Sequence, residues 1–513
     1  MQPIKFDNTY ARDLPGFYVA CQPASVLAPA LLYLNRPLAD ELGLDAAALD
    51  GREGAALFAG NTVPEGAEPL AQVYAGHQFG GFSAQLGDGR ALLLGEVINR
   101  QGQRRDIALK GSGRTPYSRG GDGKAAVGPM LREVLIGEAM HALGIPSTRA
   151  LAVVATGERV LREGLLPGAV LTRVAASHLR VGTFQFFATR GELDKLRQLA
   201  DYTIARHDPA LAGTPGRYVA LLRAVAERQA RLIAQWMNVG FIHGVMNTDN
   251  MTISGETIDY GPCAFMEAYD PDTVFSSIDH GGRYAYGNQA PIARWNLARL
   301  AEALLPLMAD GDDKAAVQQA VAEVTAVIDA FPGWYGQALL QGRRAKLGLQ
   351  TAGDGSKDGD DSGDSDSSDD SLLTEDWLVL LQQHGVDFTL AWRRLADAAA
   401  GDANPLRALF AEAAAVNPWL ERWRARCAQE DADASNAHGA RAARMRRVNP
   451  WIIPRNHRVE EALAAASAQG DLTRFQSLMA ALQRPYDEDP GLAHYAEPAP
   501  AQVTAAYQTY CGT

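Results

Sequence analysis

The chain has 513 residues, of which 47% are hydrophobic and 21% charged, a composition typical of soluble globular proteins. Its net charge of -12 disfavours a nucleic-acid-binding surface, although 8 Asp and 1 Lys in residues 351–372 supply -7 of it. Four widely spaced cysteines form no CxxC pair, and no stretch stays apolar for the ~18 residues of a membrane span. We therefore expect a cytoplasmic protein whose partners include neither nucleic acid nor membrane.

The first 70 residues are rich in Ala and Leu and contain no polar cluster typical of catalysis. We expect residues 1–70 to form a helical segment that braces the rest of the chain.

Residues 71–175 have a different sequence pattern, in which Gly-rich turns separate short apolar runs. Their length and the bounding Gly and Asp residues favour strands. One helix is predicted among them, with Pro129 in its first turn and Gly144 and Pro146 at its end. The sequence thus predicts a small β-rich lobe with one internal helix, whose strands include residues 91–94, 107–110, 151–154 and 169–172.

The remainder is predicted to be helical. Apolar residues recur at three- and four-residue spacing from Glu192 to Arg206 and from Tyr218 to Met237, within a larger helical lobe over residues 176–349. Residues 350–372 are dominated by Gly, Ser and Asp, which bury too little apolar surface to offset the entropy of ordering, so we expect a disordered insert. A helical extension is predicted over residues 373–513. The fold class is therefore α+β, with a protein-kinase-like arrangement of two lobes.

Lys110 ends one apolar run and precedes a loop, residues 111–124, that contains five glycines and three basic residues. Such a loop lets backbone N–H groups and cations approach phosphates closely. A flexible surface loop with a solvated lysine explains this segment equally well when it is taken alone. Upstream, Gly87 and Gly89 form a Gly-x-Gly that could cover a nucleotide, but a plain Asp-Gly hairpin turn is an equally good interpretation.

Glu133 shares a helix face with Met130, Gly137 and Met140, which are otherwise apolar. An acid on such a face needs a cation, and kinases pair a strand lysine with a helix glutamate to orient the lysine toward nucleotide phosphates. We expect Glu133 to pair with Lys110. The alternative is an exposed glutamate at the edge of the stripe.

The segment from His243 to Asn250 is the most informative. Kinases place a His, then a catalytic Asp, then a metal-binding Asn at fixed spacing, and by that spacing Val245 stands at the position of the Asp. Instead, Asp249 lies beside Asn250, and Asp259 opens an Asp-Tyr-Gly that resembles the Asp-Phe-Gly magnesium motif. Two oxygen ligands of this kind suit Mg²⁺, which keeps waters and is completed by substrate phosphates; Mn²⁺ is also possible.

Several longer stretches resemble the selenoprotein O family of protein adenylyltransferases, which are kinase-like proteins that bind ATP in an inverted orientation. The resemblance covers nearly the whole chain. Family members that contain selenocysteine carry it near the C-terminus, where this chain has Cys511, so a redox role for Cys511 or Cys263 stays open. The matching stretches are residues 74–80, 85–91, 109–123, 171–183, 243–251, 259–262 and 449–456.

The resemblance implies a role for each matching site residue. Asp249 would be the general base that activates an acceptor hydroxyl, and Asn250 and Asp259 would bind the metal. ATP would bind with its α-phosphorus toward the acceptor, so that AMP moves to a Ser, Thr or Tyr hydroxyl of a protein and pyrophosphate leaves. The expected nucleotide contacts come from Gly87, Gly89, Arg90, Lys110 (oriented by Glu133), Asp122, Gly123, Arg173, Arg180 and Asp259.

Two other functions remain open from the sequence. A small-molecule phosphotransferase would use Asp249 as the base for γ-phosphate transfer, and a pseudokinase would bind nucleotide without catalysis.

Overall fold

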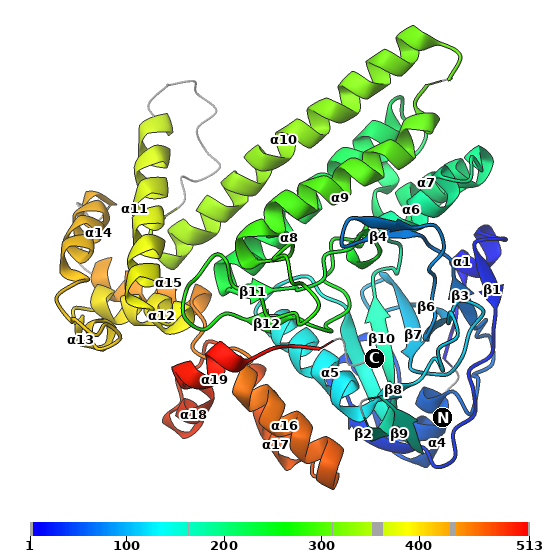
Figure 1. The fold of residues 1–513 in the computed structure, drawn as a ribbon, viewed down its shortest axis with the longest axis horizontal. Helices are drawn as coiled ribbons and strands as arrows, with labels where there is room; N and C mark the ends of the chain where they lie inside the picture. Colours follow the sequence, from blue (N-terminus) through cyan, green and yellow to red (C-terminus); the bar gives the residue numbers. More distant parts are fainter. Residues whose placement is uncertain (1–3, 163, 310, 351–362, 431–436, 511–513) are drawn as a thin grey trace.

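The computed structural model describes residues 4–162, 164–309, 311–350, 363–430 and 437–510. One side of the molecule is built on an antiparallel sheet with the strand order β1-β3-β6-β7-β10-β9-β2, and β8 pairs with β10 (Figure 1). The strands are β1 (Tyr18–Ala20), β2 (Ala30–Leu34), β3 (Leu70–Gln72), β6 (Ala91–Ile98), β7 (Arg104–Lys110), β8 (Ala125–Ala126), β9 (Arg149–Leu161) and β10 (Leu165–Ala175). All four runs predicted as strands are confirmed.

Successive side chains of these strands point to opposite faces of the sheet, as the period of two requires. Val153 belongs to the large core that includes helix α5 (Val127–Ala142), whereas the next residue, Val154, belongs to a smaller core on the other face. The smaller core is covered by α2 (Arg36–Glu41), α3 (Ala46–Leu49) and α4 (Arg52–Ala59). The helix predicted from Pro129 to Gly144 is confirmed, and it corresponds to α5.

The prediction that residues 1–70 form only a helical brace is wrong in part. Besides the short helix α1 (Thr9–Asp13) and α2 to α4, this segment contributes β1, beside β3, and β2, beside β9. The Ala- and Leu-rich sequence of β2 favours a helix locally, but pairing with β9 decides its conformation, as tertiary context often does.

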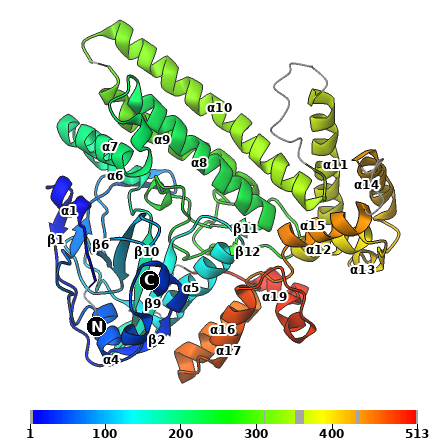
Figure 2. The same ribbon diagram turned by 180° about the vertical axis from the view of Figure 1, so that it is seen from behind.

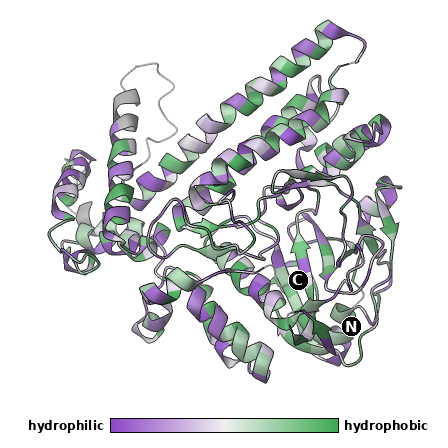
Figure 3. Cartoon of the chain, in the orientation of Figure 1, coloured by the Kyte–Doolittle hydropathy of each residue, from purple (hydrophilic) through white to green (hydrophobic). Residues whose placement is uncertain are grey.

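Helices follow the sheet: α6 (Val181–Ala188), α7 (Leu193–His207), α8 (Arg217–Val239), α9 (Gln289–Leu304) and α10 (Lys314–Lys346). The two predicted helices correspond to α7 and α8. Figure 3 shows hydrophobic and hydrophilic residues mixed along α10, which packs on α8. Between α8 and α9 runs an irregular segment with the strand pair β11 (Phe241–Ile242) and β12 (Ala264–Phe265) and the one-turn helix η2 (Thr248–Asn250).

The C-terminal part is helical, as predicted, and α16 and α17 pack against α5 (Figure 2). Residues 351–362 of the predicted insert lie outside the described residues. The prediction of a loop is wrong for residues 363–372, because they belong to α11. Within this part of α11, buried Asp370 accepts hydrogen bonds from Arg344 and Arg426. The helices are α11 (Gly363–His384), α12 (Phe388–Ala399), α13 (Asn404–Arg407), α14 (Asn417–Glu430), α15 (Ala437–Val448), α16 (Asn456–Gln469), α17 (Thr473–Leu482), α18 (Ala493–Ala496) and α19 (Ala501–Ala506).

Candidate active site

A cavity of about 1280 Å³ lies where the sheet, α5 and the irregular segment after α8 meet. The tail after α19, from Tyr507 to Tyr510, also lines it. All the site residues expected from the sequence line this one cavity: Gly87, Gly89, Arg90, Lys110, Asp122, Gly123, Glu133, Arg173, Arg180, Asp249, Asn250 and Asp259.

Lys110 is the last residue of β7, and Glu133 lies in α5, so the two side chains meet between the sheet and the helix that covers it. Both are buried, and they form an ion pair. The Lys110 Nζ also lies 2.7 Å from Asp259 Oδ1. The structure therefore brings together the expected pair, and it adds Asp259 as a second anion on the same lysine.

Asp259 is paired with two cationic side chains of the cavity. Arg173 Nη1 lies 2.8 Å from the same Oδ1 that Lys110 contacts. Burial by itself would raise the pKa of Asp259, but Lys110, Arg173 and Arg180 outweigh it and hold that pKa well below its usual value. Asp259 also has a φ of 62°, which is uncommon for residues other than glycine. Its carboxylate is therefore ionised and fixed at neutral pH.

Arg180 lies at the start of α6, nearly fully buried. Its guanidinium stacks over the Tyr74 ring at 4.4 Å from the centroid, and its Nη1 is 3.6 Å from Asp88 Oδ1. The Nε and Nη1 atoms of Arg180 have no hydrogen-bond partner within the described residues. Unsatisfied buried donors are costly, and an anion in the cavity would satisfy them.

Asp249 and Asn250 belong to η2. Gln78 Nε2 donates to Asp249 Oδ2 at 3.1 Å, while the buried Asp249 Oδ1 has no hydrogen-bond partner within the described chain. Burial raises the pKa of Asp249 to about 6. The Nδ2 of Asn250 donates to Val245 O at 3.0 Å, which fixes the amide plane. Val245 supplies its carbonyl to this contact, and its apolar side chain offers no base at this position.

Two glycine loops close one side of the cavity and are tied to each other. Thr115 Oγ1 donates to Asp88 O at 2.6 Å, and a Cβ at Gly87 would lie 2.6 Å from the Tyr117 ring. At Gly123, φ is 68° and a Cβ would lie 2.0 Å from Gly113 O. Only glycine fits at these contacts, so the backbone stays close to the space between the loops.

The residues at the cavity fit a divalent cation. Within the described ranges no three His, Cys, Asp or Glu side chains cluster as a metal site. Asn250 and Asp259 supply one amide and one carboxylate group, which are hard oxygen donors. A Mg²⁺ ion held by few protein ligands and completed by phosphates and water matches such a donor set.

Four contact residues escaped the sequence reasoning. Three of them contact expected site residues: Gln78 contacts Asp249, Tyr74 contacts Arg180, and His178 contacts Arg173. These three lie in the stretches 74–80 and 171–183 that resemble the family, and this resemblance could have indicated them. Arg162 pairs with Asp122 at 3.0 Å from the turn between β9 and β10, where no motif marked it. Cys511 lies outside the described residues.

Comparison with known proteins finds relatives that match nearly the whole chain. The chain is 60% identical over 500 residues to the protein nucleotidyltransferase YdiU of Chromobacterium violaceum, covering 98% of this chain and 100% of the relative. Relatives of the same name from Cereibacter sphaeroides and Rhizobium meliloti are 60% and 56% identical, over 99% and 100% of this chain and 100% of each relative. These relatives are nucleotidyltransferases by name, which is the class of enzyme expected from the sequence.

The family model described as "Protein adenylyltransferase SelO" matches residues 1–483. The chain belongs to this family, and the resemblance stated from its motifs is confirmed. No described helix is both long enough and apolar enough to cross a lipid bilayer.

Proposed function

We propose that this protein transfers AMP from ATP to Ser, Thr or Tyr hydroxyls of other proteins and releases pyrophosphate. The observation that carries the proposal is the environment of Asp249, within a chain of the SelO family. Asp249 lines the same cavity as the cations Lys110, Arg173 and Arg180 and has one buried oxygen that no described residue satisfies, whereas Val245 leaves the usual kinase position without a base.

We assign the phosphates of ATP to the cationic side of the cavity. Lys110, held by Glu133, and the two arginines suit the charge of a triphosphate, and guanidinium groups can make paired contacts with its oxygens. The remaining nucleotide contacts are assigned to the two glycine loops, with Gly87, Gly89 and Arg90 in one and Asp122 and Gly123 in the other. We further propose that ATP binds in the inverted orientation that the family resemblance implies, which would turn its α-phosphorus toward Asp249.

The reaction then follows from these positions. The Asp249 carboxylate accepts the proton of the acceptor hydroxyl, and the hydroxyl oxygen forms a bond to the α-phosphorus. The bond between the α-phosphorus and the oxygen that bridges to the β-phosphate breaks, and pyrophosphate leaves with its electron pair. Lys110, Arg173 and Arg180 stabilise the charge that develops on the phosphate oxygens.

Asn250 and Asp259 would hold Mg²⁺, or Mn²⁺, in this site. When bound, such an ion neutralises phosphate charge and orients the phosphates. Lys110 and Arg173 both contact the Asp259 carboxylate, so they would have to share it with the ion or turn toward the phosphates of ATP. The negative charge of the nucleotide would favour the second arrangement.

We also propose a kinase-like division of the chain: a β-rich lobe over residues 71–175 and a helical lobe over 176–349, with the active site between them and extensions at both ends. The antiparallel sheet with α5, followed by the helices α6 to α10, supports this division. A cytoplasmic location, suggested by the four separated cysteines, belongs to the same proposal.

Incubation with ATP labelled at either the α- or the γ-phosphate tests the proposed reaction. We expect label from the α position, but not from the γ position, to become bound to acceptor proteins. Transfer from the γ position would instead indicate a phosphotransferase. Binding of ATP without transfer from either position would indicate a pseudokinase.

A further inference from the structure

Arg173 is fixed from behind by a buried histidine. Its Nε donates to His178 Nε2 at 3.2 Å, while its Nη1 contacts Asp259 at 2.8 Å. Arg173 lies in β10 and His178 five residues later, just before α6. Both side chains are 3% exposed. His178 therefore holds the Nε side of the Arg173 guanidinium, while Nη1 of the same group contacts the carboxylate of Asp259.

Asp106, in β7, fixes the histidine in turn. Its Oδ2 lies 2.9 Å from His178 Nδ1 and accepts a second hydrogen bond, also of 2.9 Å, from the backbone N–H of His178. Because Arg173 Nε is a donor, His178 Nε2 must be the acceptor, and Nδ1 carries the proton toward Asp106. Burial lowers the pKa of His178, which agrees with a neutral ring in this tautomer.

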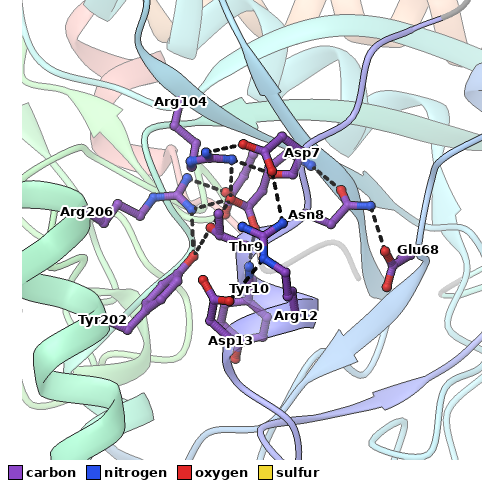
Figure 4. Close-up of polar contacts among 12 residues, drawn as sticks. Asp7, Asn8, Thr9, Tyr10, Arg12, Asp13, Glu68, Arg104, Tyr202 and Arg206 are labelled. Carbon is purple, nitrogen blue, oxygen red and sulfur yellow. Dashed lines mark hydrogen bonds and ion pairs between the residues drawn. The ribbon is translucent and has the colours of Figure 1, made fainter.

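The chain of contacts continues away from the cavity. Arg206 donates to Asp106 Oδ1 at 2.5 Å and to Glu96 Oε2 at 2.9 Å. Burial would raise the pKa of Asp106, but Arg206 and His178 lower it to about 2, so this carboxylate stays charged. Figure 4 shows the far end, where Arg206, Tyr202 and Arg104 gather around the N-terminal residues Asp7 and Thr9. The histidine is thus anchored to buried Asp106, which Arg206 holds in turn.

We propose that His178, held by Asp106, is a positioning residue that sets the orientation of Arg173 for the phosphates of ATP. The inference rests on the proposed function only in assigning phosphate binding to Arg173. A free arginine side chain loses considerable rotamer freedom when it binds an anion, and a partner that fixes it beforehand removes part of that cost. Partners of this kind behind metal ligands typically change affinity or activity by about 10- to 100-fold when they are removed.

Two substitutions separate the two ring nitrogens of His178. The terminal amide of glutamine lies near the position of Nε2, so His178→Gln can still accept from Arg173. The shorter asparagine lies near Nδ1, so His178→Asn keeps the contact with Asp106 but does not reach Arg173. A matched control is His207→Asn, because His207 is partly buried nearby and contacts Ser177 at 2.8 Å rather than Arg173.

The measurement is calorimetric titration of each variant with a non-hydrolysable ATP analogue and Mg²⁺, together with thermal unfolding. We expect His178→Asn to weaken binding by roughly 10-fold or more. His178→Gln should retain affinity within about 3-fold, and His207→Asn should bind as the unchanged protein does. In an Arg173→Lys background, His178→Asn should add less than about 2-fold, because residues that act as a unit are not additive.

Equal affinities for His178→Asn and the unchanged protein would overturn the inference. So would equal losses in His178→Gln and His178→Asn, since the contact with Arg173 would then not matter. If His178→Asn does not fold, His178→Gln decides alone, and a loss of more than about 10-fold contradicts the inference. Transfer of α-label by the unchanged protein is measured in parallel, so that failure of the proposed function is recognised separately.

Discussion

At the scale of single residues, contacts within the chain fix the positions of the charged groups in the cavity. Asp259 is contacted by Lys110 and Arg173, and Asp249 by Gln78. Asp249 differs from Asp259 because its Oδ1 is buried and has no hydrogen-bond partner within the described residues. This difference is expected for a group that accepts a proton from the substrate, whereas Asp259 is held as a permanent anion.

Asp249→Asn should therefore stop transfer without preventing nucleotide binding. A positioned general base typically contributes about 10²- to 10⁴-fold to the rate, so we expect a loss of at least 10²-fold, with affinity for the ATP analogue within about 3-fold. Rates of α-label transfer and calorimetric affinity are the two measurements. Transfer by Asp249→Asn at the rate of the unchanged protein would exclude Asp249 as the base.

Gly123→Ala should disrupt the loop after Lys110, because the new Cβ would lie 2.0 Å from Gly113 O. Gly120 is the matched control, since it has a similar positive φ of 85° but no atom within 4 Å of an added Cβ. We expect Gly123→Ala to lower both thermal stability and ATP affinity, and Gly120→Ala to cost only about 1 kcal/mol of backbone strain. Similar behaviour of the two variants would show that the close approach to Gly113 is unimportant.

At the scale of elements, the sequence predicted those structures whose pattern is local. The strands at 91–94 and 107–110, and α5, α7 and α8, follow from apolar spacing and from their Gly and Pro boundaries. The pair Lys110 and Glu133 followed from placing each on its element. The strand β2 and the contact of Arg173 with Asp259 did not follow, because both depend on partners more than 80 residues away in the chain.

Lys346, at the end of α10, makes the stability of the fold depend on pH. It is buried, its Nζ lies 4.9 Å from the Trp392 ring centroid, and no carboxylate in the described chain pairs with it. Burial lowers its pKa to about 7. Between this value and the usual 10.5, the unfolded chain binds the proton more strongly, so stability rises as pH rises through this window.

Lys346→Met should remove this dependence. The stability advantage of the variant, measured as the free energy of unfolding relative to the unchanged protein, should be larger at pH 7 than at pH 10.5. At about 1.4 kcal/mol per pKa unit, this difference should be up to roughly 4 to 5 kcal/mol. Denaturant unfolding at several pH values measures the difference, and Lys314→Met at the exposed start of α10 is the control. Parallel pH profiles for Lys346→Met and the unchanged protein would contradict the burial argument.

At the scale of the whole molecule, the C-terminal extension is joined to the segment that carries the active site. Arg455, before α16, is fully buried and pairs at 2.6 Å with both Glu267 and Asp387. Glu460 of α16 contacts Arg132 of α5, the helix that supplies Glu133. The extension therefore supports α5 from the side opposite to the sheet.

Arg455→Met should destabilise the whole fold, because it leaves two buried carboxylates without their cation. Removing one partner of a buried ion pair typically costs about 3 to 5 kcal/mol. Arg458→Met, one helical turn further along and paired with more exposed Glu461, should cost less than about 1 kcal/mol. Chemical denaturation of both variants tests this, and equal stabilities would show that Arg455 does not join the two parts.

The proposed inverted orientation of ATP connects these scales, since it would turn the α-phosphorus rather than the γ-phosphorus toward Asp249. A crystal structure with a non-hydrolysable ATP analogue and Mg²⁺ measures it directly. We predict that the α-phosphorus is the phosphorus nearest to Asp249, with the phosphates contacted by Lys110, Arg173 and Arg180. A structure in which the γ-phosphorus lies nearest to Asp249 would contradict the proposed reaction.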